Sequence, residues 1–119
     1  MITLLIVDDE KGMEEFAKPY FERRGCNVFY APSGNKGLEL FTTNNPDMVL
    51  LDLGLPDMDG REVLAKIKSS GRSTKVAILT GSSEEAVKDS VLPFGPDAYF
   101  MKPCKLPLIL EQIEKWFKA

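Results

Sequence analysis

The stretch MVLLDLGLPDMDG, residues 48–60, decides the fold. It opens with the apolar run Met48–Leu51, which is typical of a buried strand, and the run stops at Asp52. Glycine and proline then predict a turn. Asp59, with Glu62 three residues further on, has the spacing of a capped helix N-terminus. The stretch therefore predicts a buried strand that ends on an acid and leads directly into a helix.

Four further apolar runs repeat this pattern along the chain. They are Ile2–Val7, Val28–Ala31, Val76–Leu79 and Ala98–Met101. The segments between the runs have helical periodicity, which is clearest in two stripes: Met13, Phe16, Ala17, Tyr20 and Phe21, and Leu106, Ile109, Leu110, Ile113 and Phe117. Continuously apolar strands joined by helices form a parallel sheet covered on both faces. We therefore predict an α/β fold with a doubly wound, five-stranded parallel sheet.

Two helices carry separate predictions. Pro19 lies inside the first helical stripe, where it should remove one backbone hydrogen bond and bend the helix. Ser82 and Glu85 have capping-box spacing and predict the start of the fourth helix.

Length and charge exclude several classes of function. At 119 residues the chain has room for one core, so we predict a single domain over residues 1–119. A formal net charge of −3 leaves no basic surplus for direct binding of nucleic acid. No apolar stretch approaches the roughly 18 residues that cross a bilayer, so we expect no membrane insertion and a cytoplasmic location.

Histidine and cysteine usage narrows the chemistry further. Histidine is absent, which excludes histidine-based triads, histidine–metal sites and an internal phosphohistidine. Any such group has to come from a partner. Cys26 and Cys104 lie far apart with no paired motif, so we predict that they serve packing and form neither a zinc site nor a disulfide.

Polar side chains end four of the predicted strands. Asp8 and Asp9 follow the first strand, Asp52 ends the third, Thr80 the fourth and Lys102 the fifth. Doubly wound sheets bind ligands at the carboxyl ends of their strands, so these side chains should share one pocket. Clustered carboxylates repel one another unless a cation compensates, and Mg²⁺ suits a site with few protein oxygens and several waters.

The predicted pocket has the parts of a phosphoryl-transfer site. A carboxylate beside Mg²⁺ can act as a nucleophile toward phosphorus and form an aspartyl phosphate. Lys102 would supply a positive charge for the phosphoryl oxygens, and Thr80 a hydroxyl donor. Gly81 would leave room for the phosphoryl group beside the backbone. Together these residues predict an acyl-phosphate site.

Four segments resemble the receiver domains of two-component response regulators, of the stand-alone, chemotaxis-regulator-like kind. LLIVDDE (4–10) resembles the opening acidic pair of that family, MVLLDLGLPDMDG (48–60) its phosphoacceptor segment, VAILTG (76–81) its switch-hydroxyl strand and DAYFMKP (97–103) its Lys-Pro end. The resemblance extends over nearly the whole chain, from Ile2 to Phe117. It implies the flavodoxin-like strand order 2-1-3-4-5.

The resemblance also implies roles for the acidic residues. Asp52 would accept a phosphoryl group from a histidine kinase or a phosphotransfer protein. Asp9 would bind Mg²⁺ directly and Asp8 mainly through water, while Asp52 and the backbone carbonyl of Gly54 complete the protein ligands. The chain would catalyse only its own phosphorylation and dephosphorylation, so we expect no enzyme activity on other substrates.

A second group of residues is implied in switching. Lys102 would pair first with Asp52 and then with the phosphoryl group, and the Lys102–Pro103 bond is expected to be cis. Thr80 would move toward the phosphoryl group, and Tyr99 would rotate into the space left behind. An aromatic residue in an edge strand also often serves packing alone. The switch would bias the face formed by the fourth helix, the fifth strand and the fifth helix.

Output would pass to a separate downstream protein, and a phosphorylation-dependent dimer is left open.

Three alternatives to this function remain at this point. The first is a receiver domain cut from a larger regulator or hybrid kinase. The second is a magnesium-dependent phosphohydrolase with an aspartyl nucleophile, although such enzymes want an acid where Gly54 stands. The third is a flavodoxin-like flavin binder, although the acids of DDEKG (8–12) would repel the flavin phosphate.

Overall fold

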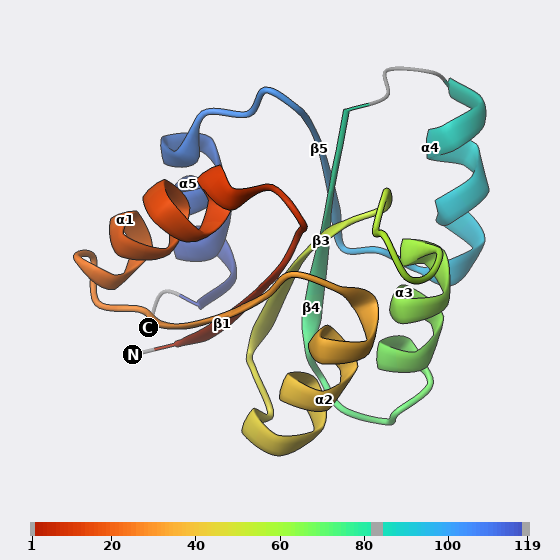
Figure 1. Cartoon of the computed structure of the whole chain (residues 1–119), viewed down its shortest axis with the longest axis horizontal. Coiled ribbons are helices and arrows are strands. Elements are labelled where there is room, and N and C mark those ends of the chain that lie inside the picture. Colours follow the sequence, from red (N-terminus) through yellow and green to blue (C-terminus); the bar gives the residue numbers. More distant parts are fainter. Residues whose placement is uncertain (1, 82–84, 118–119) are drawn as a thin grey trace.

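The computed structural model describes the backbone of residues 2–81 and 85–117. Five parallel strands form one sheet in the order β2-β1-β3-β4-β5 (Figure 1). The strands are β1 (Thr3–Val7), β2 (Asn27–Ala31), β3 (Met48–Asp52), β4 (Lys75–Thr80) and β5 (Ala98–Met101). Each strand begins and ends within one residue of its predicted apolar run. The predicted α/β class and the strand order 2-1-3-4-5 are confirmed.

Helices cover both faces of the sheet (Figure 1). One face carries η1 (Met13–Ala17), a π-helix, together with α1 (Lys18–Glu22) and α5 (Leu106–Phe117). The other face carries α2 (Gly34–Asn44), α3 (Gly60–Lys68), α4 (Glu85–Val91) and the short 3₁₀ helix η2 (Leu92–Phe94). No helix in the described residues is long and apolar enough to cross a membrane.

The core consists of two buried clusters, one on each side of the sheet. Alternation along β1 shows the arrangement, because Leu4 and Ile6 pack in the layer of α1 and α5, whereas Leu5 and Val7 pack in the layer of α2 and α3. Cys26 and Cys104 are free, half-buried thiols that pack against the first of these layers, as predicted. The central strands are therefore buried on both faces, and their carboxyl ends are the natural place for polar side chains.

The first helix accommodates Pro19 by changing helix type. The π-helical segment Met13–Ala17 comes directly before α1, and Pro19 lies within the first two positions of α1. A proline at a helix start costs little because the first N–H groups of a helix have no intrahelical acceptor. The missing N–H group thus falls at the junction between two helical segments.

Two carboxylates in the loop after β3 hold it in place. Asp59 caps α3 as predicted, accepting a hydrogen bond from the backbone N of Arg61 at 2.9 Å. Asp57 reaches across to the start of α2, where its carboxylate accepts from the backbone N of Gly34 at 2.8 Å and of Asn35 at 2.9 Å. The cap predicted at Ser82 lies outside the described residues.

Candidate functional site

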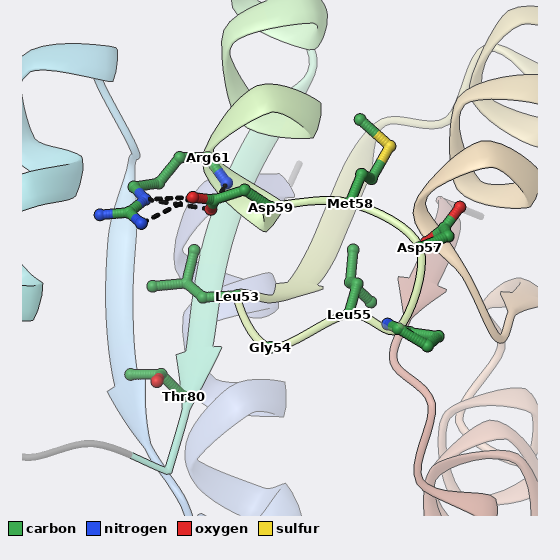
Figure 2. A pocket seen from close by; sticks show the side chains of 9 residues that line it. Leu53, Gly54, Leu55, Asp57, Met58, Asp59, Arg61 and Thr80 are labelled. Atoms are coloured by element: carbon green, nitrogen blue, oxygen red, sulfur yellow. Dashed lines mark hydrogen bonds and ion pairs between the residues drawn. The ribbon is translucent and has the colours of Figure 1, made fainter.

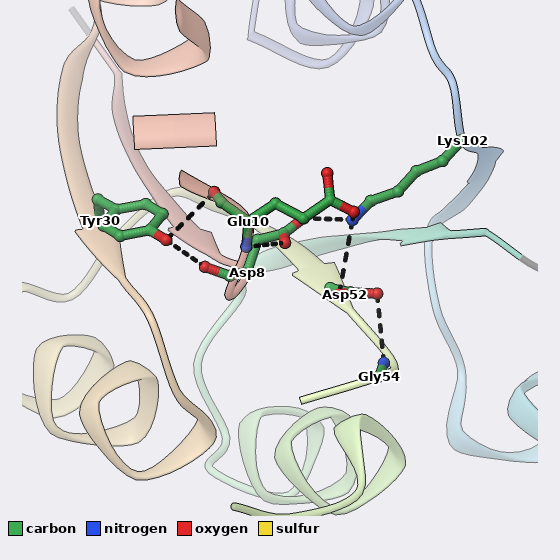
Figure 3. A network of polar contacts seen from close by, with 6 residues as sticks. All are labelled: Asp8, Glu10, Tyr30, Asp52, Gly54 and Lys102. Carbon is green, nitrogen blue, oxygen red and sulfur yellow. Dashed lines mark hydrogen bonds and ion pairs between the residues drawn. The ribbon is translucent and has the colours of Figure 1, made fainter. Parts of the chain in front are cut away.

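The carboxyl ends of β1 and β3 bring three aspartates together. Figure 3 shows two of them, Asp8 and Asp52. These strands are neighbours, with Val7 opposite Leu51, so Asp8 and Asp52 follow side by side. Carboxylate oxygens of Asp8, Asp9 and Asp52 all lie within 4.8 Å of one another. Asp8 is 1% exposed and Asp52 7%, whereas Asp9 faces solvent. The result is an acidic cluster with a buried floor and an open side.

Lys102 enters this cluster from the end of β5. Its Nζ lies 2.8 Å from Asp8 Oδ2, 2.8 Å from Glu10 Oε1 and 3.5 Å from Asp52 Oδ2 (Figure 3). The backbone N of Lys102 donates to the carbonyl of Thr80 at 2.7 Å, which ties the lysine to the end of β4. The Lys102–Pro103 bond is cis, as predicted.

Burial and charge act in opposite directions on the two innermost groups. Burial raises the pKa of Asp8 above its usual range, although the contacts with Lys102 and with the N–H of Glu10 act to lower it. Burial alone would lower the pKa of Lys102, but its contacts with Asp8 and Glu10 outweigh this effect and raise it above the usual range. Lys102 is therefore a permanent cation in this site.

The donor set fits a hard divalent cation. Asp8 Oδ1 accepts a hydrogen bond from the backbone N of Glu10 at 3.0 Å. Asp8 Oδ2 is fully buried and accepts no hydrogen bond from the described residues, although it forms an ion pair with Lys102. The Lys102 ammonium is the cation at a cluster of four carboxylates, which belong to Asp8, Asp9, Glu10 and Asp52. Oxygen-rich, under-neutralised sites of this kind suit Mg²⁺.

Thr80 and Gly54 lie on the other side of the acidic cluster. Both line an open pocket of about 630 Å³ formed by the loop after β3 and the end of β4 (Figure 2). The backbone N of Gly54 donates to Asp52 Oδ1 at 3.2 Å and so orients the carboxylate. Thr80 is buried at the end of β4, beside Met101 of β5. The lining begins at Leu53, the residue after Asp52, so the pocket adjoins the acidic cluster.

Tyr99 lies farther down β5 than the other predicted residues. It is half-buried against the cluster beneath α3, and the ammonium of Lys88 lies 5.8 Å from its ring centroid. Tyr99 pairs with Ile78, two residues before Thr80 on the adjacent strand. Side chains two positions apart on a strand share a face, so Tyr99 and Thr80 point to the same side of the sheet.

A model of the response regulator receiver domain matches residues 4–114. The chain belongs to this family. Receiver domains as a family work with histidine kinases and output domains. The kinase implied by the resemblance agrees with this, while the separate downstream protein stays a prediction.

Related receivers occur in proteins of different length. The KDP operon transcriptional regulatory protein KdpE of Escherichia coli (strain K12) is 38% identical over 103 residues, which cover 87% of this chain and 45% of KdpE. Sporulation initiation phosphotransferase F of Bacillus subtilis (strain 168) is 32% identical over 113 residues, which cover 95% of this chain and 91% of that protein. The receiver thus spans less than half of the first relative and nearly all of the second.

Solved structures agree with the fold in detail. The crystal structure of a receiver domain protein (CheY-like) from Methanospirillum hungatei JF-1 matches with a TM-score of 0.92 at 31% identity, covering 98% of this chain and 93% of that one. The receiver domain of the Francisella response regulator 1452 matches with a TM-score of 0.88 at 29% identity, covering 97% of this chain and 95% of that one.

Two residues of this receiver site were not predicted from the sequence. Glu10 pairs with Lys102, and its place as the third acid of LLIVDDE was an available signal. Tyr30, at the end of β2, donates its hydroxyl to the backbone carbonyl of Asp8 at 2.5 Å (Figure 3). No sequence pattern points to this contact, because it depends on how β2 lies against β1.

Proposed function

We propose that this receiver domain is a phosphorylation switch in which Asp52 accepts a phosphoryl group from a histidine kinase or a phosphotransfer protein, with Mg²⁺ bound. One observation carries the proposal. The ammonium of Lys102 reaches the carboxylates at the tips of β1 and β3, where three aspartates already cluster within 4.8 Å. The Lys102 ammonium and a bound metal ion would together neutralise the negative charge of an added phosphoryl group.

The proposed transfer needs positioning more than acid–base catalysis. A carboxylate oxygen of Asp52 forms a bond to phosphorus while the bond from phosphorus to the donor histidine nitrogen breaks, and that nitrogen keeps the electron pair. Gly54 N–H orients the carboxylate from one side. Lys102 lies 3.5 Å from the other oxygen and is placed to follow the charge onto the phosphoryl group.

The metal would be held by side chains of the acidic cluster. Asp9 and Asp52 would supply direct oxygen ligands, Asp8 would act mainly through water, and the backbone carbonyl of Gly54 would complete the set. Bound Mg²⁺ would neutralise part of the carboxylate charge and attract the phosphoryl oxygens. The activity proposed is confined to phosphorylation and dephosphorylation of this chain.

Signalling would follow from the change of charge at Asp52. The Thr80 hydroxyl would move toward the phosphoryl oxygens, and Tyr99 would rotate on the same side of the sheet. The adjoining face of α4, β5 and α5 exposes Met101 and Leu108, each 51% exposed, which suits a separate protein partner. A phosphorylation-dependent dimer through that face, or an output domain beyond a receiver within a longer regulator, would use the same change.

Intact-mass measurement after incubation with Mg²⁺ and acetyl phosphate tests the proposal. The wild-type chain should gain one hydroxylamine-labile phosphoryl group, and the gain should be lost in Asp52→Asn and in the presence of chelator. Asp57→Asn is the matched control, because Asp57 is an exposed acid in the same loop that contacts the start of α2 instead of the cluster. Labelling of Asp52→Asn equal to wild type would overturn the assignment.

A further inference from the structure

Tyr30 connects β2 to the turn that carries the acidic pair. It lies one residue before the end of β2 and pairs with Ile6 of β1. Its hydroxyl extends past the end of β1 and lies 2.5 Å from the carbonyl oxygen of Asp8 and 3.4 Å from that of Glu10 (Figure 3). A phenol has one proton to donate, so the short bond goes to Asp8 and Glu10 receives a weaker share. The hydroxyl thus contacts the backbone on both sides of Asp9.

The same turn is held to β2 by further hydrogen bonds. The backbone N of Asp8 donates to the carbonyl of Ala31 at 3.0 Å, and the backbone N of Glu10 donates to Asp8 Oδ1 at 3.0 Å. The Tyr30 ring packs against the buried cluster beneath α1 and α5, so its hydroxyl projects from a rigid base. Strand β2 therefore acts as a template for the conformation of residues 8–10.

This template works against electrostatic repulsion. The carboxylates of Asp8, Asp9 and Asp52 lie within 4.8 Å of one another, and like charges at that distance repel. Without a restraint, the exposed turn would relax by moving Asp9 outward into solvent. A restraint on the carbonyl groups of the two neighbouring residues, Asp8 and Glu10, keeps the Asp9 carboxylate near the other two before any cation arrives.

We propose that Tyr30 is a positioning residue for the divalent cation, because its hydroxyl holds the carbonyl groups of Asp8 and Glu10, the residues on either side of Asp9, and so preorganises the acidic turn. The inference rests on the proposed function, since it takes the acidic cluster as the cation site. Groups that orient metal ligands through hydrogen bonds commonly change metal affinity by about 10–100-fold when removed. Tyr30 acts through the backbone, so the expected effect is the lower limit, about ten-fold.

Tyr30→Phe separates the hydroxyl from the packing of the ring. The matched control is Tyr20→Phe on α1, because Tyr20 is also half-buried in the same layer and its hydroxyl makes no hydrogen bond to the described residues. The Mg²⁺ dissociation constant of each full chain is measured by isothermal titration calorimetry. Amide hydrogen exchange of peptides that cover residues 8–11 is measured in chelator.

We expect Tyr30→Phe to bind Mg²⁺ about ten-fold more weakly than wild type and to exchange faster in the acidic turn, and Tyr20→Phe to match wild type in both. An unchanged dissociation constant in Tyr30→Phe would overturn the proposal, even if the variant unfolds at a lower temperature, since that combination describes a purely structural tyrosine. An equal loss in Tyr20→Phe would overturn it as well. If the wild type does not bind Mg²⁺, the metal site itself is refuted. That result differs from failure of the positioning role, in which the wild type and Tyr30→Phe bind Mg²⁺ equally well.

Discussion

Gly60, the first residue of α3, is pressed against the backbone that carries Asp52, the proposed acceptor. A Cβ atom at this position would lie 2.6 Å from the carbonyl oxygen of Asp52 and 2.6 Å from Cα of Leu53. Ordinary contacts of a Cβ atom begin at 3.4 Å, so the two segments would have to separate by 3.4 − 2.6 = 0.8 Å. The neighbouring atoms belong to the main chain and cannot rotate away. Gly60→Ala should therefore strain the junction of β3 and α3.

The expected cost follows from two opposing effects. Inserting a methyl group into a tightly packed place typically costs about 1–3 kcal/mol. Alanine is favoured over glycine in a helix by at most about 1 kcal/mol, and less at the first position. We expect a net loss of about 1–2 kcal/mol in the free energy of unfolding, or roughly 4–8 °C in Tm for a chain of this length. The hydrogen bond from Gly60 N to the carbonyl of Leu53, now 3.1 Å, should also be disturbed.

Urea unfolding followed by circular dichroism, with chelator present, measures this loss. Gly12→Ala is the control, because Gly12 has helical angles (φ −58°, ψ −30°) and its Cβ would come no closer than 3.9 Å to Phe16. That substitution should stabilise the protein by up to about 1 kcal/mol. If Gly60→Ala is as stable as wild type while Gly12→Ala behaves as expected, the steric reasoning is wrong.

Three further substitutions test charge and packing. Burial raises the pKa of Asp8, so its ionised form costs stability at neutral pH, and Asp8→Asn should be more stable than wild type in chelator but less stabilised by Mg²⁺. Urea unfolding with and without Mg²⁺ checks both effects, and stabilisation by Mg²⁺ equal to that of wild type would contradict the assignment of Asp8 to the metal site. Hydrogen bonds from the N–H groups of Asn35 and Gly34 lower the pKa of Asp57, which contributes stability above the usual carboxyl pKa of about 3.9 that is lost as the pH falls through the folded value. Asp57→Asn should therefore be less stable than wild type at neutral pH, and the difference should shrink on acidification; a difference that does not vary with pH would refute this account. Ile109→Ala should lower the free energy of unfolding in urea by about 2–5 kcal/mol, because Ile109 is 0% exposed on the buried face of α5. A loss below about 1 kcal/mol would mean that neighbouring side chains move in to fill the cavity.

The strands and the acidic cluster could be predicted from the sequence for the same physical reason. Strands buried on both faces must be apolar, so Met48–Leu51 marks the interior of the strand, and the next residue, Asp52, is the first polar one, at the carboxyl edge of the sheet. Parallel strands place their carboxyl ends on one edge, which brings Asp8 to Asp52 without any knowledge of side-chain contacts. The order of residues along each strand was enough to predict this cluster.

Other parts of the site depend on distances between strands, which the order of residues does not contain. The contact of Tyr30 with Asp8 needs both the register of β2 against β1 and the length of a tyrosine side chain. The π-helical segment before α1 likewise depends on how the helix packs around Pro19. Glu10 was visible in the sequence as a third acid, but only the structure shows that it pairs with Lys102 and does not simply face solvent.

The distribution of burial along the sheet favours one route for the proposed signal. Residues of β3 are buried throughout and those of β4 after the first, so a change of charge at Asp52 meets a rigid floor beneath it. Strand β5 is different, because Ala98, Tyr99 and Phe100 are half-buried and Met101 is exposed. Lys102 is both the continuation of this strand and the cation that contacts the cluster, so a shift of its ammonium toward a phosphoryl group would pull on the least buried of the five strands. Weakly buried elements rearrange at the lowest free-energy cost. The response to phosphorylation should therefore pass through β5 and the helices beside it, while the three strand pairings that do not involve β5 stay as they are.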